Sequence, residues 1–75
     1  MTIAESLKRF RKEFGVTQQQ VADSIQIVKP AYQKYEYGKN IPLATVLVKL
    51  ADAYNVSVDY LLGRTDNPQI AAPLK

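Results

Sequence analysis

Residues 17–39, TQQQVADSIQIVKPAYQKYEYGK, combine hydrogen-bonding and cationic side chains with the spacing of two short amphipathic helices joined by a tight turn. The second of these helices carries Lys29, Gln33 and Lys34. Ammonium and amide groups can bind the exposed edges of guanine and adenine, and the major groove of B-form DNA admits one α-helix. Two helices this short bury little by themselves, so the pattern predicts that the second is inserted into such a groove.

The composition of the 75-residue chain argues against an enzyme and against a metal or cofactor site. It contains no cysteine and no histidine, so thiolate ligands, disulfides and the commonest catalytic base are absent. Its aspartates are scattered, without a carboxylate pair or a nucleophile beside a base. No apolar run could cross a membrane, and the N-terminus lacks the order of a signal peptide. We expect one small cytoplasmic domain with no cofactor, no membrane contact and no small-molecule ligand.

The positive charge is concentrated in the first half of the chain. The formal net charge is +3, and beyond Asn40 three basic residues balance three acidic ones, so the whole excess lies within residues 1–40. Such a distribution suits one face that meets phosphates, although ordinary scatter over a solvated surface gives the same count.

Apolar spacing and helix-stopping residues predict an all-α fold of five helices, because no window alternates polar and apolar residues as a strand would. The first helix has an apolar stripe that ends in Phe14, and Thr17 with Gln20 makes a capping box for the second. A glycine or asparagine, which can adopt the left-handed backbone conformation that ends a helix, follows the first, third, fourth and fifth helices. The expected helices cover residues 3–14, 17–25, 29–37, 43–54 and 58–62.

Several short motifs then follow one another in a specific order. They are Gly15 followed by Val-Thr-Gln, Tyr-Glu-x-Gly at 35–38, Pro42, Lys-Leu-Ala at 49–51 and Val-Ser-Val-Asp-Tyr-Leu-Leu-Gly at 56–63. Through them the chain resembles the Cro/C1-type (XRE) helix-turn-helix family of phage repressors and bacterial regulators. The resemblance implies a compact five-helix lambda-repressor-like domain that binds a double-stranded DNA operator, usually as a homodimer, and regulates transcription, with repression the expected mode.

Three residues depart from the pattern of that family. Gln26 stands in the turn where glycine is common, and Val28 stands where serine or threonine would cap the third helix. Leu43 likewise replaces a capping serine before the fourth helix. A side chain at a left-handed position and a missing cap each cost about 1 kcal/mol. These changes bear on the local geometry of the third helix, while the fold expectation is unaffected.

The resemblance also implies which residues contact DNA. The groove-facing positions of the third helix are Lys29, Pro30, Ala31, Gln33 and Lys34. Contacts to the phosphate backbone are implied for Gln18, Lys39 and Asn40, and Tyr37 either touches sugar-phosphate or covers the helix end. For each residue the alternative is an ordinary place on a solvated surface.

Arg11 and Glu36 have a different implied role, a partly buried ion pair that fixes the third helix against the first. Removal of Glu36 should then destabilise the fold more than loss of a surface pair would. Tyr32 and Tyr35, three residues apart, are expected to point into the core.

Two further expectations concern partners. An alternative function is a protein-interaction module of the same fold, such as an antitoxin, antirepressor or adaptor, but the polar and cationic face of residues 29–39 favours DNA. Residues 1–64 would form the DNA-binding domain, and residues 65–75, with two prolines, a tail or short interaction arm. Contact between two copies is expected to involve exposed residues among Val58, Tyr60, Leu61, Leu62 and Ile70.

Overall fold

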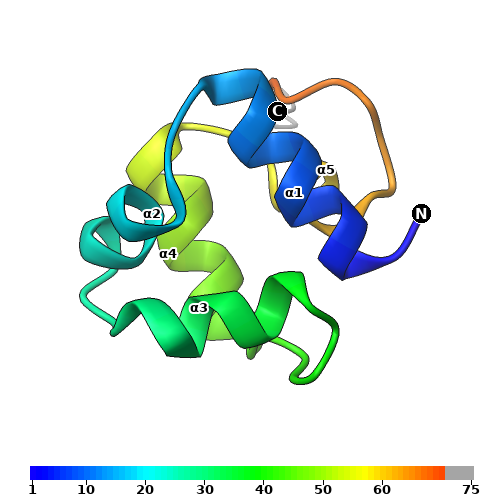
Figure 1. Cartoon of the computed structure of the whole chain (residues 1–75). Helices are drawn as coiled ribbons and strands as arrows, with labels where there is room; N and C mark the ends of the chain where they lie inside the picture. Colours follow the sequence, from blue (N-terminus) through cyan, green and yellow to red (C-terminus); the bar gives the residue numbers. More distant parts are fainter. Residues whose placement is uncertain (71–75) are drawn as a thin grey trace.

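The computed structural model describes residues 1–70, in which five α-helices and no strand are found. The all-α prediction is confirmed (Figure 1). The helices are α1 (Ile3–Phe14), α2 (Gln18–Ser24), α3 (Lys29–Glu36), α4 (Ala44–Tyr54) and α5 (Val58–Leu62). Predicted and observed helix ends differ by no more than one residue, because the signals that stop or cap each helix lie close to it in the chain.

The helices pack around one apolar core. Helix α1 contacts α3 and α5, α2 contacts α3 and α4, and α4 contacts α5. In Figure 1, α3 lies along the lower edge of the molecule, with the turn from α2 at one end. The core is made of Leu7, Phe10, Val21, Ala22, Ile25, Tyr32, Leu47, Leu50, Ala51, Val56, Tyr60 and Leu61. Every helix thus contributes to it, which leaves α3 supported on its inner side and open on its outer side.

Local capping chemistry accounts for the helix starts. The predicted capping box is present at α2, where the Thr17 hydroxyl accepts from the backbone N–H of Gln20 at 3.1 Å and the Gln20 amide oxygen accepts from that of Thr17 at 2.8 Å. Thr2 and Glu5 make a second box at α1. In contrast, Val28 and Leu43 precede α3 and α4 without a side-chain cap, and Pro30 in the first turn of α3 supplies a preset φ instead.

The expected apolar stripe of α1 is only partly buried. Phe14 is 40% exposed, although its ring packs at 5.1 Å from that of Phe10 and at 6.2 Å from that of Tyr54. It lies at the last position of the helix, where no further helix covers its outer face. The fully buried part of the stripe therefore ends one turn earlier, at Phe10.

The surface expected to meet a second copy needs correction. Tyr60 and Leu61 are fully buried in the core, so neither can belong to it. Val58 and Leu62 are half-buried, and Ile70 is 59% exposed. A five-residue helix is too short for its apolar spacing to distinguish the two sides, which is why the sequence did not separate these residues.

Arg9 on α1 binds the segment that follows α5. Its guanidinium donates to Asp66 Oδ1 at 2.8 Å and to the carbonyl oxygens of Tyr60 and Thr65 at 2.8 and 3.1 Å, and lies 4.4 Å from the centre of the Tyr60 ring. The backbone N–H of Ser57 donates to the carbonyl oxygen of Pro68 at 2.9 Å. Residues 65–70 therefore lie against the helical body; the rest of the expected tail lies outside the described residues.

The turn between α2 and α3 gives a stability prediction. Gln26 has φ 62°, in the left-handed region, where a side chain costs about 1 kcal/mol relative to glycine. Gln26→Gly is therefore expected to raise the free energy of unfolding by about 1 kcal/mol, measured by urea denaturation. Asn55→Gly is the matched control: Asn55 has φ 55°, but asparagine tolerates this region, so the gain should be smaller. A Gln26→Gly protein no more stable than the parent would contradict the strain.

Candidate nucleic-acid interface

Helix α3 has two chemically different sides. Tyr32 and Glu36, four residues apart, are buried against the rest of the domain. Pro30, Lys34 and Tyr37 follow one another at spacings of four and three, so they share the opposite side, and all three are exposed. Tyr35, expected with Tyr32 in the core, is only partly buried and packs against the core from its edge. The outer side of α3 consequently presents one cation, Lys34, between Pro30 and the ring of Tyr37.

Glu36 anchors the inner side of α3 to α1. Its carboxylate is 1% exposed and accepts from Arg11 Nε at 2.7 Å and from Arg11 Nη2 at 3.0 Å, a bidentate ion pair. Burial by itself raises the pKa of Glu36, but the bidentate contact with Arg11, helped by the polar groups of Tyr32 and Gln18, outweighs burial and leaves that pKa below its usual value. The carboxyl group is therefore ionised at neutral pH although it is buried.

Two glutamines extend this ion pair into a network across three helices. Gln18 Nε2 donates to Glu36 Oε1 at 3.1 Å, and Gln33 Nε2 donates to Gln18 Oε1 at 2.9 Å. The network runs from Arg11 on α1 through Glu36 on α3 and Gln18 on α2 to Gln33. Each amide nitrogen carries two protons, so Gln18 and Gln33 each keep one N–H, and Gln33 also keeps its carbonyl oxygen. Those are the groups that a bidentate contact with adenine requires.

The remaining candidate contacts lie around the ends of α3. Lys29 is exposed at its start, and Ala31 is half-buried one turn before Lys34. After Gly38 the chain folds back, so that the N–H groups of Lys39 and Asn40 both donate to the carbonyl oxygen of Lys34, at 2.9 and 3.2 Å.

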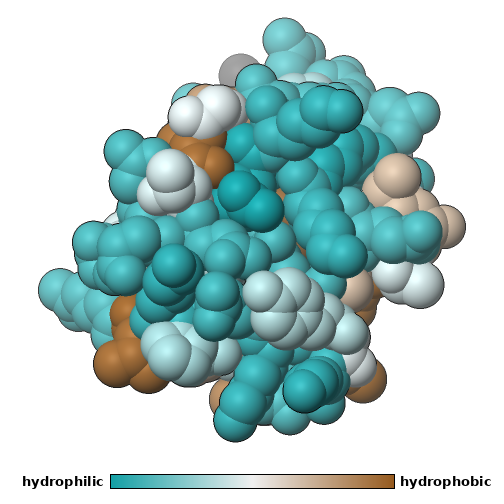
Figure 2. Space-filling model, viewed as in Figure 1, coloured by the Kyte–Doolittle hydropathy of each residue, from teal (hydrophilic) through white to brown (hydrophobic). Residues whose placement is uncertain are grey.

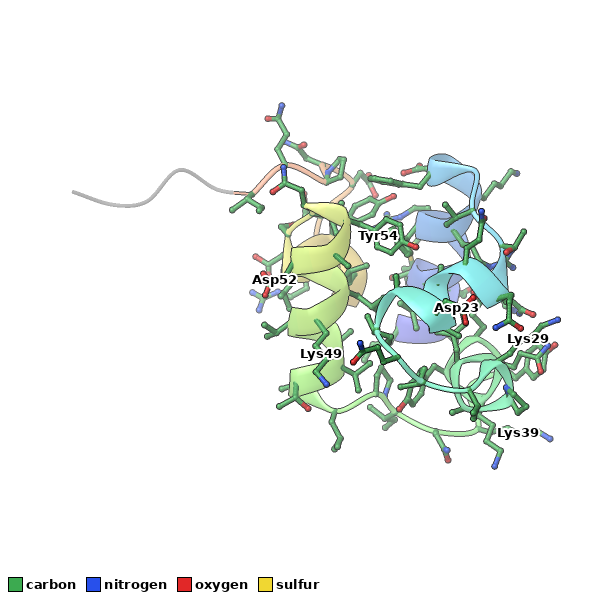
Figure 3. The ribbon with its side chains drawn as sticks, turned by 90° about the vertical axis from the view of Figure 1, so that its left-hand side faces the viewer. Asp23, Lys29, Lys39, Lys49, Asp52 and Tyr54 are labelled. Atoms are coloured by element: carbon green, nitrogen blue, oxygen red, sulfur yellow. The ribbon has the colours of Figure 1, made fainter. Side chains whose placement is uncertain are left out.

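Figure 3 shows which lysines lie together. Lys29 and Lys39 lie on one side of the molecule, while Lys49 lies on α4, well away from them. Tyr37, at the end of α3, is 58% exposed, which leaves its ring accessible rather than covered. Lys29 at the start of α3 and Lys39 after its end therefore lie on the same side of the molecule.

The face of the molecule seen in Figure 1 is mostly hydrophilic when drawn as a surface (Figure 2). Hydrophobic colour is confined to small patches, one of them at the lower left, where the turn between α2 and α3 lies. Val28 in that turn is 69% exposed. Val28 is not among the predicted contacts, because its apolar side chain in the sequence signals only a missing helix cap.

Two kinds of site are not found in the described part of the chain. Residues 1–70 hold no cluster of three or more histidine, cysteine, aspartate or glutamate side chains that could bind a metal ion. Among the same residues no helix is long and apolar enough to cross a membrane.

The similar proteins found by sequence and by structure are transcriptional regulators. A helix-turn-helix family model matches residues 7–61. The transcriptional repressor RstR of the cryptic phage CTXphi, from Vibrio cholerae, is 46% identical over 71 residues, which make up 92% of this chain and 63% of that protein. The uncharacterized HTH-type transcriptional regulator YobD of Bacillus subtilis is 44% identical over 64 residues, covering 85% of this chain and 57% of that protein.

A solved structure shares the fold as well. The crystal structure of a transcriptional regulator from Listeria innocua superposes with a TM-score of 0.74 at 31% sequence identity, covering 83% of this chain and 58% of that one. The 75-residue chain thus spans about three fifths of the length of these similar proteins.

Proposed function

Because this chain belongs to the helix-turn-helix family, we propose that it binds duplex DNA in a sequence-specific manner and regulates transcription. Helix α2, the turn at residues 25–28 and α3 form the helix-turn-helix, and α3 enters the major groove. The protein acts by binding rather than by catalysis. The resemblance to this family that the sequence motifs suggested is confirmed by the match over residues 7–61.

The observation that carries the proposal is the contrast between the two sides of α3. The inner side is fixed by the buried Glu36 carboxylate, and the outer side presents Lys34 and neighbouring polar groups to solvent. Charged residues are depleted at the core of protein interfaces, so the exposed Lys29 and Lys34 fit DNA better than a docked protein.

The proposed contacts fall into two groups with different effects. Base edges are read from the start and outer side of α3, by Lys29, Pro30, Ala31, Gln33 and Lys34. The sugar-phosphate backbone is held by Gln18, Tyr37, Lys39 and Asn40. Gln18 lies at the N-terminus of α2, where free N–H groups and the helix dipole favour an anion.

Assembly and location follow from the same proposal. A single short helix reads too few base pairs for useful specificity, which supports a homodimer on a two-fold operator. Residues 1–64 would be the DNA-binding unit, and residues 65–75 an arm beyond it. Repression is supported by the name of the similar phage protein. The site of action would be the cytoplasm, where a bacterial regulator meets DNA.

Selection of bound fragments from a genomic library tests the function. We expect one recurring motif with two-fold symmetry, and binding that weakens steeply with salt because phosphate contacts release counterions. The Lys49→Ala protein, altered on α4, should select the same motif. Salt-dependent binding without any motif would contradict sequence-specific regulation. No DNA binding, together with stable capture of another protein, would favour the interaction module instead.

A further inference from the structure

Val28 is an exposed apolar residue at the position where a helix cap is normally polar. It is the residue just before α3, its backbone is extended, and its side chain makes no capping hydrogen bond. Thr2, Thr17 and Ser57 supply such a bond at α1, α2 and α5. Val28 therefore lacks the helix stabilisation that a polar cap provides. It gains no burial in return, since it is 69% exposed.

Val28 lies at the end of α3 that enters the groove in the proposed function. Its carbonyl oxygen accepts from the N–H of Ala31 at 3.0 Å and from that of Tyr32 at 3.4 Å, so Val28 is held against the first turn of the helix. Lys29 and Pro30 follow directly and are exposed. A helix that enters the major groove contacts base edges with its N-terminal residues. On the proposed function, Val28 therefore reaches the bases together with Lys29 and Pro30.

The chemistry of a valine limits what it can recognise there. Its side chain neither donates nor accepts hydrogen bonds, so it cannot read the polar groups of guanine, adenine or cytosine. The one apolar group on the major-groove edges is the C5-methyl of thymine. Leu43, the other uncapped helix start, is similarly exposed but belongs to α4, which does not enter the groove in this arrangement.

We propose that Val28 recognises the C5-methyl group of a pyrimidine, thymine in ordinary DNA, at one position in each half of the operator. This inference rests on the proposed function and adds a specificity-determining residue to it. Contact between the two methyl-bearing groups excludes water from both, and burial of one methyl group corresponds to about fourfold in affinity. Val28, which gives α3 no cap, thus contributes selectivity for thymine.

The test uses the operator that the full chain selects. Each thymine in a half-site is replaced singly by deoxyuridine, which removes only the methyl group, and the dissociation constant is measured at fixed salt. We expect one replacement to weaken the parent protein about fourfold and to leave Val28→Ala nearly unaffected. Val48→Ala is the matched control, because Val48 is also an exposed valine, 49% exposed, but lies on α4. It should behave as the parent does.

A second arm tests the methyl group itself. Cytosine and 5-methylcytosine are compared at the sensitive position, and we expect the methylated base to be bound more tightly by the parent but not by Val28→Ala. Equal losses for parent and Val28→Ala at every deoxyuridine would overturn the inference while leaving DNA binding intact. The inference would also be overturned if no deoxyuridine replacement changed the dissociation constant of the parent protein. Failure of the chain to select any DNA site would instead overturn the proposed function, and this inference with it.

Discussion

Arg11→Met is expected to lower the free energy of unfolding by about 3 kcal/mol at neutral pH, the largest stability effect that we foresee. The substitution leaves the Glu36 carboxylate buried, at 1% exposed, and removes both hydrogen bonds from Arg11. The hydrogen bond from Gln18 remains. Glu36→Ala should cost less, because the Arg11 side chain is 29% exposed and can be hydrated when it loses its partner. Chemical denaturation measures both.

In Arg11→Met, the contribution of Glu36 to stability should change with pH in the direction opposite to that in the parent protein. In the parent protein the pKa of Glu36 is lowered, so its stabilising contribution is complete above the pKa of the unfolded chain. That contribution is lost as the pH falls through the folded value. Without Arg11, burial dominates and the pKa of Glu36 rises above its unfolded value. The contribution of Glu36 to stability is then most favourable in acid and is lost as the pH rises through the folded pKa.

Denaturation curves between about pH 4 and 7 therefore distinguish a charge effect from a packing effect. Lys12→Met is the matched control, since Lys12 is an exposed cation on the same helix, and a change of less than about 0.5 kcal/mol is expected. If Arg11→Met lost no more stability than Lys12→Met, or kept the pH slope of the parent, the ion pair would not be what fixes α3.

Lys34→Ala is expected to weaken binding to the selected operator about tenfold or more. Lys34 lies on the outer side of α3 and is exposed, so the substitution should leave the thermal stability nearly unchanged. It should also relax the selected motif at one position, because a base contact is lost. Fragment selection and titration of the chosen site measure the two effects.

Two other lysines make this result specific. Lys39→Ala should weaken binding to all sequences alike and reduce the salt slope by about one, as expected for a single phosphate contact. Lys49→Ala, on α4 and away from α3, should change little. A loss in Lys34→Ala no greater than that in Lys49→Ala would show that α3 does not enter the groove as proposed.

Features determined by neighbouring residues were predictable from the sequence. The capping box of Thr17 and Gln20 spans three positions, and the strained turn at Gln26 depends on one backbone angle. Both were found where the pattern placed them. Helix ends were predicted closely for the same reason, since glycine, asparagine and capping hydroxyl groups act within one turn.

Features that depend on distant residues were missed. No spacing rule connects Arg9 with Asp66, which lie 57 positions apart and meet only after α1 and α5 have packed. The bond between Gln18 and Gln33 was not foreseen either, because it forms only once α2 and α3 have packed together. The sequence shows Val28 as an apolar residue in a turn, but its exposure, and the proposal that it contacts a base, required the folded position of α3.

The bond from Gln33 to Gln18 has a consequence for the entropy of association. A long side chain that becomes ordered on binding loses about 0.5–1.5 kcal/mol of conformational freedom. Gln33 is already held in the free protein, so little of that loss remains for it, whereas Lys34 is exposed and must be ordered when DNA arrives. Adjacent residues on one helix would then differ in kind: Gln33 meets the operator in a preset position and demands an exact fit, while Lys34 adapts to the base that it finds.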